Sequence, residues 1–322
     1  MCELFKGRCL LTGATGYIGS MISRRLLSQG NEITVIVRDA ARLEPEIYDC
    51  VQVIQADMSD GEAILQISGK YDYVIHCAAP TKSAYMVSHP VEVTESIVNG
   101  TKYILELARR CGAKSVVYVS SMEVYGQIEC SKVSRVTEEQ MGYIDITDSR
   151  SCYPLAKLMA EGLCHFYYKE YEVPVKIARL AQTFGRGVRP DDNRVFAQFA
   201  GSVRNGTDIV LHTAGNSMGN YCDIDDTVDA ILFILLHGKD SEAYNVVNEE
   251  NTMSIREMAE LVAAKMGGGS IKVTYNIPED NRYGYAADTG LWLSGKKLKE
   301  LGWEARRGIE EMYRRMLFEK SL

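Results

Sequence analysis

The chain has 322 residues, of which 46% are hydrophobic and 25% are charged, a composition typical of a globular protein. Its formal net charge of −7 does not favour a nucleic-acid partner. The longest apolar run, residues 230–236, is too short to cross a bilayer, and the N-terminus lacks a signal-peptide pattern, so we expect a cytoplasmic protein without a membrane partner.

The cysteines and histidines predict neither a disulfide framework nor a metal site. The nine cysteines include no C-x-x-C pair, and several lie in apolar runs, as Cys77 does. Scattered thiols of this kind are typical of a reducing compartment. The five histidines form no cluster with the spacing of metal ligands, so we expect no metal.

The first half of the chain alternates between apolar strands and amphipathic helices. Strands are predicted at residues 8–13, 32–38, 51–57, 71–79, 115–121 and 175–181, and helices at 18–30, 91–112 and 153–171. Apolar strands separated by helices form a parallel sheet that is covered on both faces. Residues 1–181 are therefore predicted to form a doubly wound α/β domain of the Rossmann type.

The second half of the chain changes character. Its strands at residues 209–213, 243–248 and 271–275 are shorter, and polar connections at 182–193 and 276–293 break the alternation. We expect residues 182–322 to form mainly a smaller α/β substrate-binding lobe, with segments near 222–250 returning to the first domain. No low-complexity linker separates the two parts, so the boundary near residue 181 is read as a hinge.

Three glycines, Gly13, Gly16 and Gly19, follow the first strand and open the first helix. Glycine permits a tight turn and close approach of a diphosphate, and the helix N-terminus presents N–H groups to the phosphates. G-x-x-G-x-x-G alone is a weak motif, but its place on the first strand-to-helix turn favours a dinucleotide site. The alternative is a structural turn without a ligand.

The end of the second strand selects between NAD and NADP. In NAD enzymes an acid there hydrogen-bonds the ribose 2′-hydroxyl. The expected position is Val37, followed by Arg38 and Asp39. Arg38 suits a 2′-phosphate, so the sequence leans toward NADP, unless Arg38 is solvated and Asp39 contacts the ribose. Asp57, after the third strand, is placed to bond the adenine amino group or to lie near a helix N-cap.

Four further motifs follow the glycine turn in order: "HCAA" (76–79), "SSMEVYG" (120–126), "YPLAK" (153–157) and "KKLKELGWEA" (296–305). With them the chain resembles the extended short-chain dehydrogenase/reductases of the NAD-dependent epimerase/dehydratase family, nearest to its nucleotide-sugar epimerase, dehydratase and UDP-glucuronate decarboxylase branch. The resemblance covers nearly the whole chain. It implies an enzyme of nucleotide-sugar metabolism with bound NAD or NADP.

The resemblance also implies a homodimer, formed through the helices at about 91–110 and 153–171. Four apolar residues on these helices are compatible with such a contact and equally with packing on the sheet: Ile104, Leu107, Leu158 and Phe166.

The residues that the resemblance makes catalytic are Tyr153, Lys157 and Ser121. Tyr153 would be the acid/base of hydride transfer, and Lys157 would bind the nicotinamide ribose and lower the pKa of the phenol. A phenol with its ordinary pKa near 10 is a poor base at neutral pH, and a nearby ammonium favours the phenolate. Ser121 would hydrogen-bond the reacting hydroxyl or ketone. Asn99 would help to order the site, unless it is a solvated helix residue.

The cofactor-binding set expected from the motifs comprises Gly13, Thr15, Gly16, Tyr17, Ile18, Gly19, Arg38, Asp57, Met58, Ala78, Ala79, Asn99, Tyr153 and Lys157.

Glu123 indicates chemistry beyond hydride transfer, because a carboxylate beside a transient ketone can remove the proton alpha to it. Dehydratases of the family carry an aspartate where this chain has Met122, and methionine cannot protonate a leaving hydroxyl. The sequence therefore disfavours 4,6-dehydration and leaves epimerisation, decarboxylation or other α-proton chemistry. The stretch "RSCYPLAK" also resembles the decarboxylase branch. The alternative is that Glu123 is a carboxylate at the pocket rim.

Two departures from the family pattern concern the substrate. Gln182 replaces the usual asparagine, and Gly219 stands where an arginine usually grips the diphosphate. Arginines that could compensate are Arg186, Arg189, Arg194 and Arg282, the last of which matches a second phosphate arginine of the branch. Each is in a loop, where an arginine is more often solvated. The substrate is expected to be a nucleotide sugar or a smaller sugar.

Two other functions remain open. A net NADP-dependent reductase or dehydrogenase of a carbonyl or sugar is favoured by Arg38 and Gly219 and disfavoured by Glu123. A non-catalytic dinucleotide-sensing regulator is disfavoured because such proteins tend to lose the catalytic tyrosine or lysine, and both are present.

Overall fold

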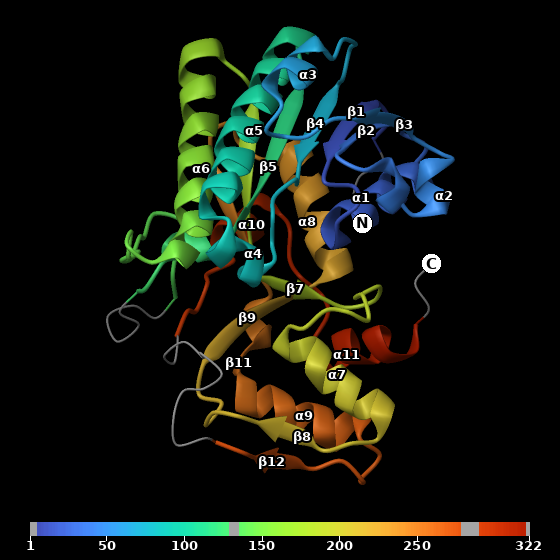
Figure 1. The fold of residues 1–322 in the computed structure, drawn as a ribbon, viewed down its shortest axis with the longest axis vertical. Coiled ribbons are helices and arrows are strands. Elements are labelled where there is room, and N and C mark those ends of the chain that lie inside the picture. The colour runs from blue at the N-terminus through green and yellow to red at the C-terminus, as the bar shows by residue number, and fades with distance from the viewer. Residues whose placement is uncertain (1–4, 129–134, 278–289, 320–322) are drawn as a thin grey trace. The chain divides into compact units, whose positions relative to one another are not determined.

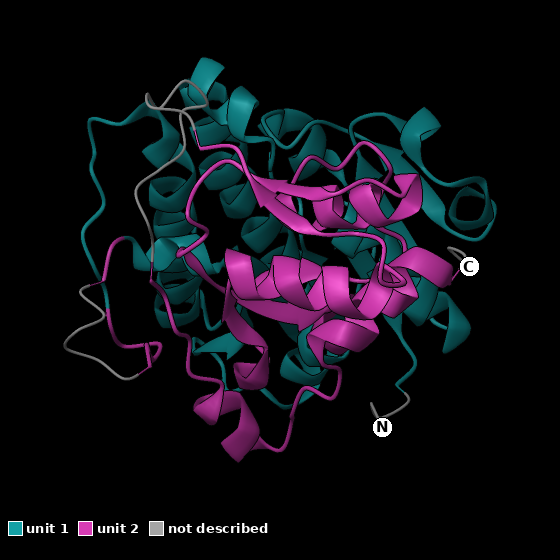
Figure 2. Ribbon diagram, turned by 90° about the horizontal axis from the view of Figure 1, so that it is seen from below, with its two compact units in different colours: residues 1–126, 141–180, 228–246 teal, residues 127–140, 181–227, 247–322 magenta. Residues whose placement is uncertain are grey.

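The computed structural model describes residues 5–128, 135–277 and 290–319 (Figure 1). The chain divides into two compact units (Figure 2). The first contains residues 1–126, 141–180 and 228–246, and the second contains residues 127–140, 181–227 and 247–322. A segment of the second unit begins at the boundary predicted near residue 181. Residues 127–140, which the sequence assigned to the first domain, belong to the second unit.

A seven-stranded parallel sheet forms the centre of the first unit, in the order β10-β6-β5-β4-β1-β2-β3. Its strands are β1 (Arg8–Thr12), β2 (Glu32–Val37), β3 (Gln52–Gln55), β4 (Tyr73–His76), β5 (Ser115–Ser121), β6 (Val175–Leu180) and β10 (Ala243–Val246). The first six lie within the predicted ranges. The seventh was predicted as a strand of the second half, and it joins this sheet beside β6. The predicted α/β class is confirmed.

The helices of the first unit are α1 (Tyr17–Ser28), α2 (Pro45–Tyr48), α3 (Gly61–Gln66), α4 (Ser83–Ser88), α5 (Pro90–Cys111) and α6 (Cys152–Tyr171), with the short 3-10 turns η1 (Ala40–Arg42), η2 (Met122–Tyr125) and η4 (Ser149–Ser151). Helix α8 (Ile224–His237) begins in the second unit and continues in the first. Helices α5 and α6 lie side by side in Figure 1, and their apolar faces share one core with the sheet.

The apolar residues weighed for a dimer contact divide between core and surface. Ile104 and Leu107 are buried in the core beneath α5. Phe166 on α6 is 53% exposed. Packing within the chain therefore accounts for the first two, and Phe166 lies on the surface.

The second unit has two small sheets. One has the order β11-β9-β7, and the other pairs β12 with β8. Its elements are β7 (Gln182–Phe184), α7 (Val195–Asn205), β8 (Ile209–Leu211), β9 (Met218–Asp223), η5 (Glu249–Asn251), β11 (Thr252–Ser254), α9 (Ile255–Met266), β12 (Val273–Tyr275), α10 (Lys296–Leu301) and α11 (Ile309–Phe318). The core gathers around the ring of Phe184, which stacks on Phe196 with centroids 4.5 Å apart and meets Tyr313 edge-on.

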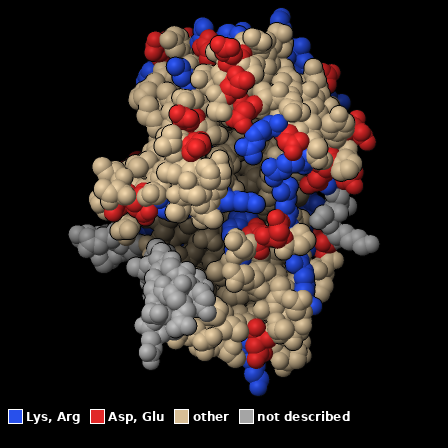
Figure 3. Space-filling model, viewed as in Figure 1, with Lys and Arg blue, Asp and Glu red and all other residues tan. Residues whose placement is uncertain are grey.

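Three further findings concern surface charge, membrane crossing and metal binding. On the face in Figure 3, Lys and Arg side chains lie among Asp and Glu side chains. No helix in the described parts of the chain has the length and apolar character that a membrane crossing requires. Within those same parts, no group of three His, Cys, Asp or Glu side chains is arranged to hold a metal ion.

A buried ion pair joins α6 to the sheet. Glu161 on α6 and Arg179 on β6 are 6% and 7% exposed. The guanidinium donates from Nε and Nη2 to the carboxylate, with a shortest distance of 2.7 Å. Its Nη1 donates to the hydroxyl of Tyr125 at 3.0 Å, and that hydroxyl donates to Oδ1 of Asn245 at 2.6 Å. The pair thus fixes α6 against β6, η2 and β10.

We expect Glu161→Gln to destabilise the protein by about 3–5 kcal/mol, because it leaves the Arg179 charge buried without a counter-charge. The matched control is Glu106→Gln, which removes a partner of Arg109 on the surface of α5 and should lower stability by less than about 1 kcal/mol. Urea unfolding followed by circular dichroism measures both. Equal effects of the two variants would contradict a stabilising role for the buried pair.

Candidate active site

The glycine turn between β1 and α1 is closely packed. Gly13 has a φ of +80°, and a Cβ there would lie 2.9 Å from the backbone N of Ala78. A Cβ on Gly19 would lie 2.1 Å from the carbonyl oxygen of Gly13. Neither position accepts a side chain without moving the backbone.

The N-terminus of α1 fits an anion. Gly16 is the N-cap, no side chain caps the helix, and its first turn holds no acidic residue. A helix N-terminus of this kind presents N–H groups and the positive end of the helix dipole. Thr15, Tyr17 and Ile18 complete the turn, so the residues present fit the diphosphate of a dinucleotide.

A buried histidine holds the ends of β1 and β4 together. The hydroxyl of Thr12 accepts from the backbone N of Ala78 at 3.1 Å, so its own proton is directed to Nδ1 of His76, 2.7 Å away. The hydroxyl of Thr101 donates to the carbonyl of Ile97, so Nε2 of His76 donates to it at 3.2 Å. Burial lowers the pKa of His76 to about 3. The imidazole is therefore neutral. Through Thr12 it holds the backbone of Ala78, which packs against Gly13. The sequence motif "HCAA" did not predict this role for His76.

The charged residues at the ends of β2 and β3 lie close together. Nη1 of Arg38 is 3.9 Å from Oδ2 of Asp57, and the Arg38 side chain is 70% exposed. Asp57 also accepts from the backbone and hydroxyl of Ser59, and these bonds lower its pKa although burial acts in the opposite direction. Asp39 accepts from the backbone N of Ala41 and caps η1. Arg38 is thus an accessible cation at the end of β2.

The other predicted cofactor residues follow strands β3 and β4 or lie on α5. Met58 follows β3 and is buried, Ala78 and Ala79 follow β4 and are half-buried, and Asn99 is half-buried on α5.

Ser121, Glu123 and Tyr153 meet at the carboxyl end of β5. Ser121 is the last residue of β5, and its hydroxyl accepts from the backbone N of Glu123 at 3.2 Å. Tyr153, at the start of α6, is 7% exposed and hydrogen-bonds Ser121. Burial raises the pKa of the phenol well above its ordinary value, and the Glu123 charge raises it further. Three of the predicted catalytic residues are thus brought together, with the phenol in its protonated form.

Lys157 lies one helical turn beyond Tyr153 and is 2% exposed. Its Nζ donates to the carbonyl of Val119 at 2.8 Å and lies 5.8 Å from the centroid of the Tyr153 ring. Burial lowers the pKa of the ammonium to about 8. The lowering of the Tyr153 pKa by Lys157 stays a prediction, because burial dominates the phenol in this structure.

Arg150 is a site residue that the sequence analysis did not assign. Its Nη2 lies 2.8 Å from Oε2 of Glu123, and its guanidinium carbon is 5.7 Å from the centroid of the Tyr153 ring. The only available signal was its place in "RSCYPLAK", three residues before the tyrosine. That stretch was interpreted as a mark of the decarboxylase branch, not as a contact.

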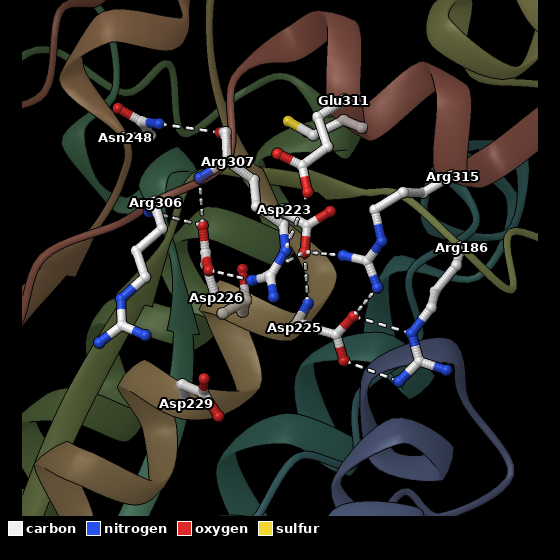
Figure 4. Close-up of polar contacts among 12 residues, drawn as sticks. Arg186, Asp223, Asp225, Asp226, Asp229, Asn248, Arg306, Arg307, Glu311 and Arg315 are labelled. Carbon is white, nitrogen blue, oxygen red and sulfur yellow. Dashed lines mark hydrogen bonds and ion pairs between the residues drawn. The ribbon is translucent and has the colours of Figure 1, made fainter. Parts of the chain in front are cut away.

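The predicted substrate arginines of the second unit have partners of their own. Arg186 donates from Nε and Nη2 to the carboxylate of Asp225, both at 2.8 Å (Figure 4). Arg315 also contacts Asp225 and donates to Asp223 at 3.0 Å. Burial alone would raise the pKa of Asp225, but hydrogen bonds from the two arginines lower it strongly. Two nitrogens of Arg186 thus serve an internal ion network; its contact with substrate stays a prediction.

The remaining substrate candidates are scattered over the second unit. Gln182 begins β7 and is exposed. Arg194 is half-exposed and pairs with Asp192, with 3.0 Å between Nε and Oδ1. Arg189 follows β7 in the same loop, and Arg282 lies outside the described residues.

Gly219 occupies β9, where it pairs with Met253 of β11. A Cβ at this position would lie 2.4 Å from the hydroxyl oxygen of Tyr221. Tyr221 is 2% exposed and meets Phe184 edge-on, so its ring has little freedom to move. A side chain at position 219 would therefore meet the Tyr221 ring, and the correspondence of this position to the family's diphosphate arginine stays a prediction.

Comparison with known proteins identifies the family. A family model described as "NAD dependent epimerase/dehydratase family" matches residues 9–247. The chain is 26% identical over 281 residues to UDP-glucuronic acid decarboxylase 1 of Xenopus tropicalis, with 87% of this chain and 65% of that protein covered. It is 27% identical over 312 residues to UDP-glucuronic acid decarboxylase 5 of Arabidopsis thaliana, with 94% and 86% covered. The chain thus spans just under two thirds of the Xenopus relative.

Solved structures share the fold. UDP-glucose 4-epimerase of Thermotoga maritima, solved with UDP-glucose, matches with a TM-score of 0.83 and 23% identity, covering 96% of this chain and 97% of that chain. A dTDP-glucose 4,6-dehydratase of Streptomyces venezuelae, solved with NAD, matches with a TM-score of 0.76 and 23% identity, covering 95% and 96%.

We expect Gly19→Ala to weaken NAD(P)+ binding and to lower stability by about 1–3 kcal/mol, because the added methyl group meets the Gly13 carbonyl. Gly201→Ala in α7 is the matched control, since a Cβ there meets nothing within 4 Å. The control should raise stability by about 0.5–1 kcal/mol. Thermal unfolding with and without NAD(P)+ measures both effects, and unchanged cofactor binding in Gly19→Ala would contradict the assigned turn.

Proposed function

The chain belongs to the NAD-dependent epimerase/dehydratase family, and from this premise we propose that it modifies a nucleotide sugar by transient oxidation of a hydroxyl to a ketone. The observation that carries the proposal is the contact set of Ser121, Glu123 and Tyr153 at the carboxyl end of β5. This edge belongs to the same unit as the glycine turn. An acid/base, a hydrogen-bonding hydroxyl and a carboxylate are the groups that such chemistry needs.

Each residue of the site has a separate role in the proposed reaction. A bound nicotinamide supplies the acceptor that takes a hydride and later returns it. Once the phenol has lost its own proton to solvent, Oη of Tyr153 takes the proton of the substrate hydroxyl and gives it back in the return step, while Oγ of Ser121 holds the reacting oxygen. Glu123 removes or exchanges a proton on the carbon next to the ketone, because the ketone acidifies that position.

Epimerisation and decarboxylation both fit these residues. Met122 offers no acid for a leaving hydroxyl, which disfavours 4,6-dehydration. The relatives named UDP-glucuronic acid decarboxylase support a uronic acid substrate, in which loss of carbon dioxide follows formation of the ketone.

We infer a preference for NADP from Arg38. Its exposed guanidinium at the end of β2 is suited to a 2′-phosphate, whereas Asp39 is engaged in capping η1.

The second candidate is a net NADP-dependent reductase. It is favoured by Arg38 and by Gly219, since the buried Tyr221 would meet a side chain at the position predicted for a diphosphate-gripping arginine. Glu123 counts against it, because net reduction needs no base at the neighbouring carbon.

We expect Tyr153→Phe to lower turnover of UDP-glucuronic acid or UDP-glucose by about 100-fold or more while the protein still binds the cofactor. Tyr171→Phe at the exposed end of the same helix is the control and should retain full activity. Absorbance at the NAD(P)H band during turnover separates the two functions. Stoichiometric oxidation of NADPH would favour the reductase over the proposed function.

We expect turnover in heavy water to leave deuterium on the product carbon next to the transient ketone, because Glu123 exchanges a proton there. Glu123→Gln should lower this incorporation by about 100-fold or more while the reduced cofactor still forms. Mass spectrometry of the product measures incorporation, and released carbon dioxide identifies decarboxylation. A product free of deuterium would rule out α-proton chemistry and leave simple hydride return.

We expect Arg38→Met to weaken NADP+ binding by about 10-fold or more with little change for NAD+, because a charge-assisted hydrogen bond to the 2′-phosphate is lost. Arg42→Met, a nearby exposed change in η1, is the control and should alter neither affinity. Calorimetric titration with both cofactors measures this. Equal weakening for NAD+ would contradict the inferred preference.

A further inference from the structure

Arg150 contacts the Glu123 carboxylate and the Tyr153 ring. Its backbone is fixed, because Oδ1 of Asp148 accepts from the Arg150 N at 2.9 Å and caps η4. Nη2 lies 3.0 Å from Oε1 and 2.8 Å from Oε2 of Glu123. The guanidinium carbon is 5.7 Å from the centroid of the Tyr153 ring. The Arg150 side chain is 29% exposed, so water only partly screens its charge.

The negative charges of an ionised Glu123 and an ionised Tyr153 would repel each other. The proposed chemistry needs Glu123 ionised and Tyr153 able to lose its proton, which sets a carboxylate beside a phenolate in a partly buried place. Like charges at short range oppose the second ionisation. Burial already raises the pKa of Tyr153, Glu123 raises it further, and the hydrogen bond to Ser121 and the charge of Arg150 lower it.

The other titratable groups that face Tyr153 do not offset the Glu123 carboxylate. Tyr118 on β5 is buried, and burial raises its pKa well above the ordinary value, so it is neutral. Nζ of Lys157 on α6 donates to the Val119 carbonyl and lies 5.8 Å from the centroid of the Tyr153 ring. Among the described residues, Arg150 is the cation that forms an ion pair with Glu123, at 2.8 Å.

We propose that Arg150 is a positioning residue whose guanidinium holds the Glu123 carboxylate and offsets its charge, so that Tyr153 can lose its proton while Glu123 stays ionised. The inference rests on the proposed function, because it assigns acid/base work to both partners. A purely structural ion pair would tie η2 to η4 and leave proton release from Tyr153 unchanged.

The test measures protons released when NAD(P)+ binds, by calorimetry in buffers of different ionisation enthalpy over about pH 7 to 10. The positive charge of the oxidised nicotinamide favours the phenolate, so binding should release the Tyr153 proton. Tyr153→Phe supplies the blank, which removes the contribution of Lys157 and other groups. The proteins compared are the wild type, Arg150→Met, Arg150→Lys, Glu123→Gln and the double variant Arg150→Met/Glu123→Gln.

The midpoint of proton release should rise by about 1 pH unit in Arg150→Met, because the carboxylate is then unopposed. It should fall in Glu123→Gln, where the guanidinium is unopposed, and return near the wild-type value in the double variant. Arg150→Lys should stay near the wild type, because it keeps the charge.

A wild-type midpoint in Arg150→Met, or a double variant that stays as high as the single one, overturns the role of Arg150 and leaves the proposed function standing. Proton release from Tyr153→Phe equal to that of the wild type overturns the role of Tyr153 and both proposals with it. If Arg150→Met lacks a cooperative thermal transition, Glu123→Gln decides, and an unchanged midpoint in that variant overturns the proposal.

Discussion

The buried ion pair between Glu161 and Arg179 is the contact on which the site geometry depends. Glu161 follows Tyr153 and Lys157 at intervals of four residues, so the three side chains share one face of α6. Because the ion pair anchors this face to β6, it fixes the rotation of α6 about its own axis. The two catalytic candidates are thereby aimed at the carboxyl end of β5 before any ligand binds. The same guanidinium reaches Tyr125 in η2, the turn that carries Glu123.

Burial raises the pKa of the buried acidic groups, and neighbouring arginines lower it. At Tyr153, burial dominates and keeps the phenol protonated. In the second unit, Asp225 is also buried, yet two guanidinium groups lower its pKa strongly, whereas its neighbour Asp223 has its pKa raised to about 6 because burial outweighs the arginines. Asp223 also faces two arginines, but Arg307 lies 3.7 Å away and the carboxylate is more deeply buried than that of Asp225, so donor geometry and depth together decide the ionisation of each acid. That is why a single arginine near Tyr153 matters.

The sequence predicted the sheet well because its strands are apolar and β-branched on both faces. It missed β7 and β9, which are short and carry polar residues. Asn220 of β9 is buried because its side chain accepts from the backbone N of Leu293, a partner 73 residues away that no local pattern reveals. The loop position of Arg186 indicated a solvated or ligand-binding side chain, and its partner Asp225 is 39 residues away. Motifs located Tyr153 and Ser121, but Arg150 is recognised only when its side chain is seen against Glu123.

Tyr221 limits which side chains position 219 can accept. Because the ring of Tyr221 is buried against Phe184, the two positions on β9 are coupled: an arginine gained at 219 while the tyrosine remains would clash before it reached any ligand. An arginine at 219 is therefore compatible with this core only together with a smaller residue at 221 and repacking of the core beneath it. Substitutions at positions 219 and 221 are therefore expected to be non-additive in their effect on stability.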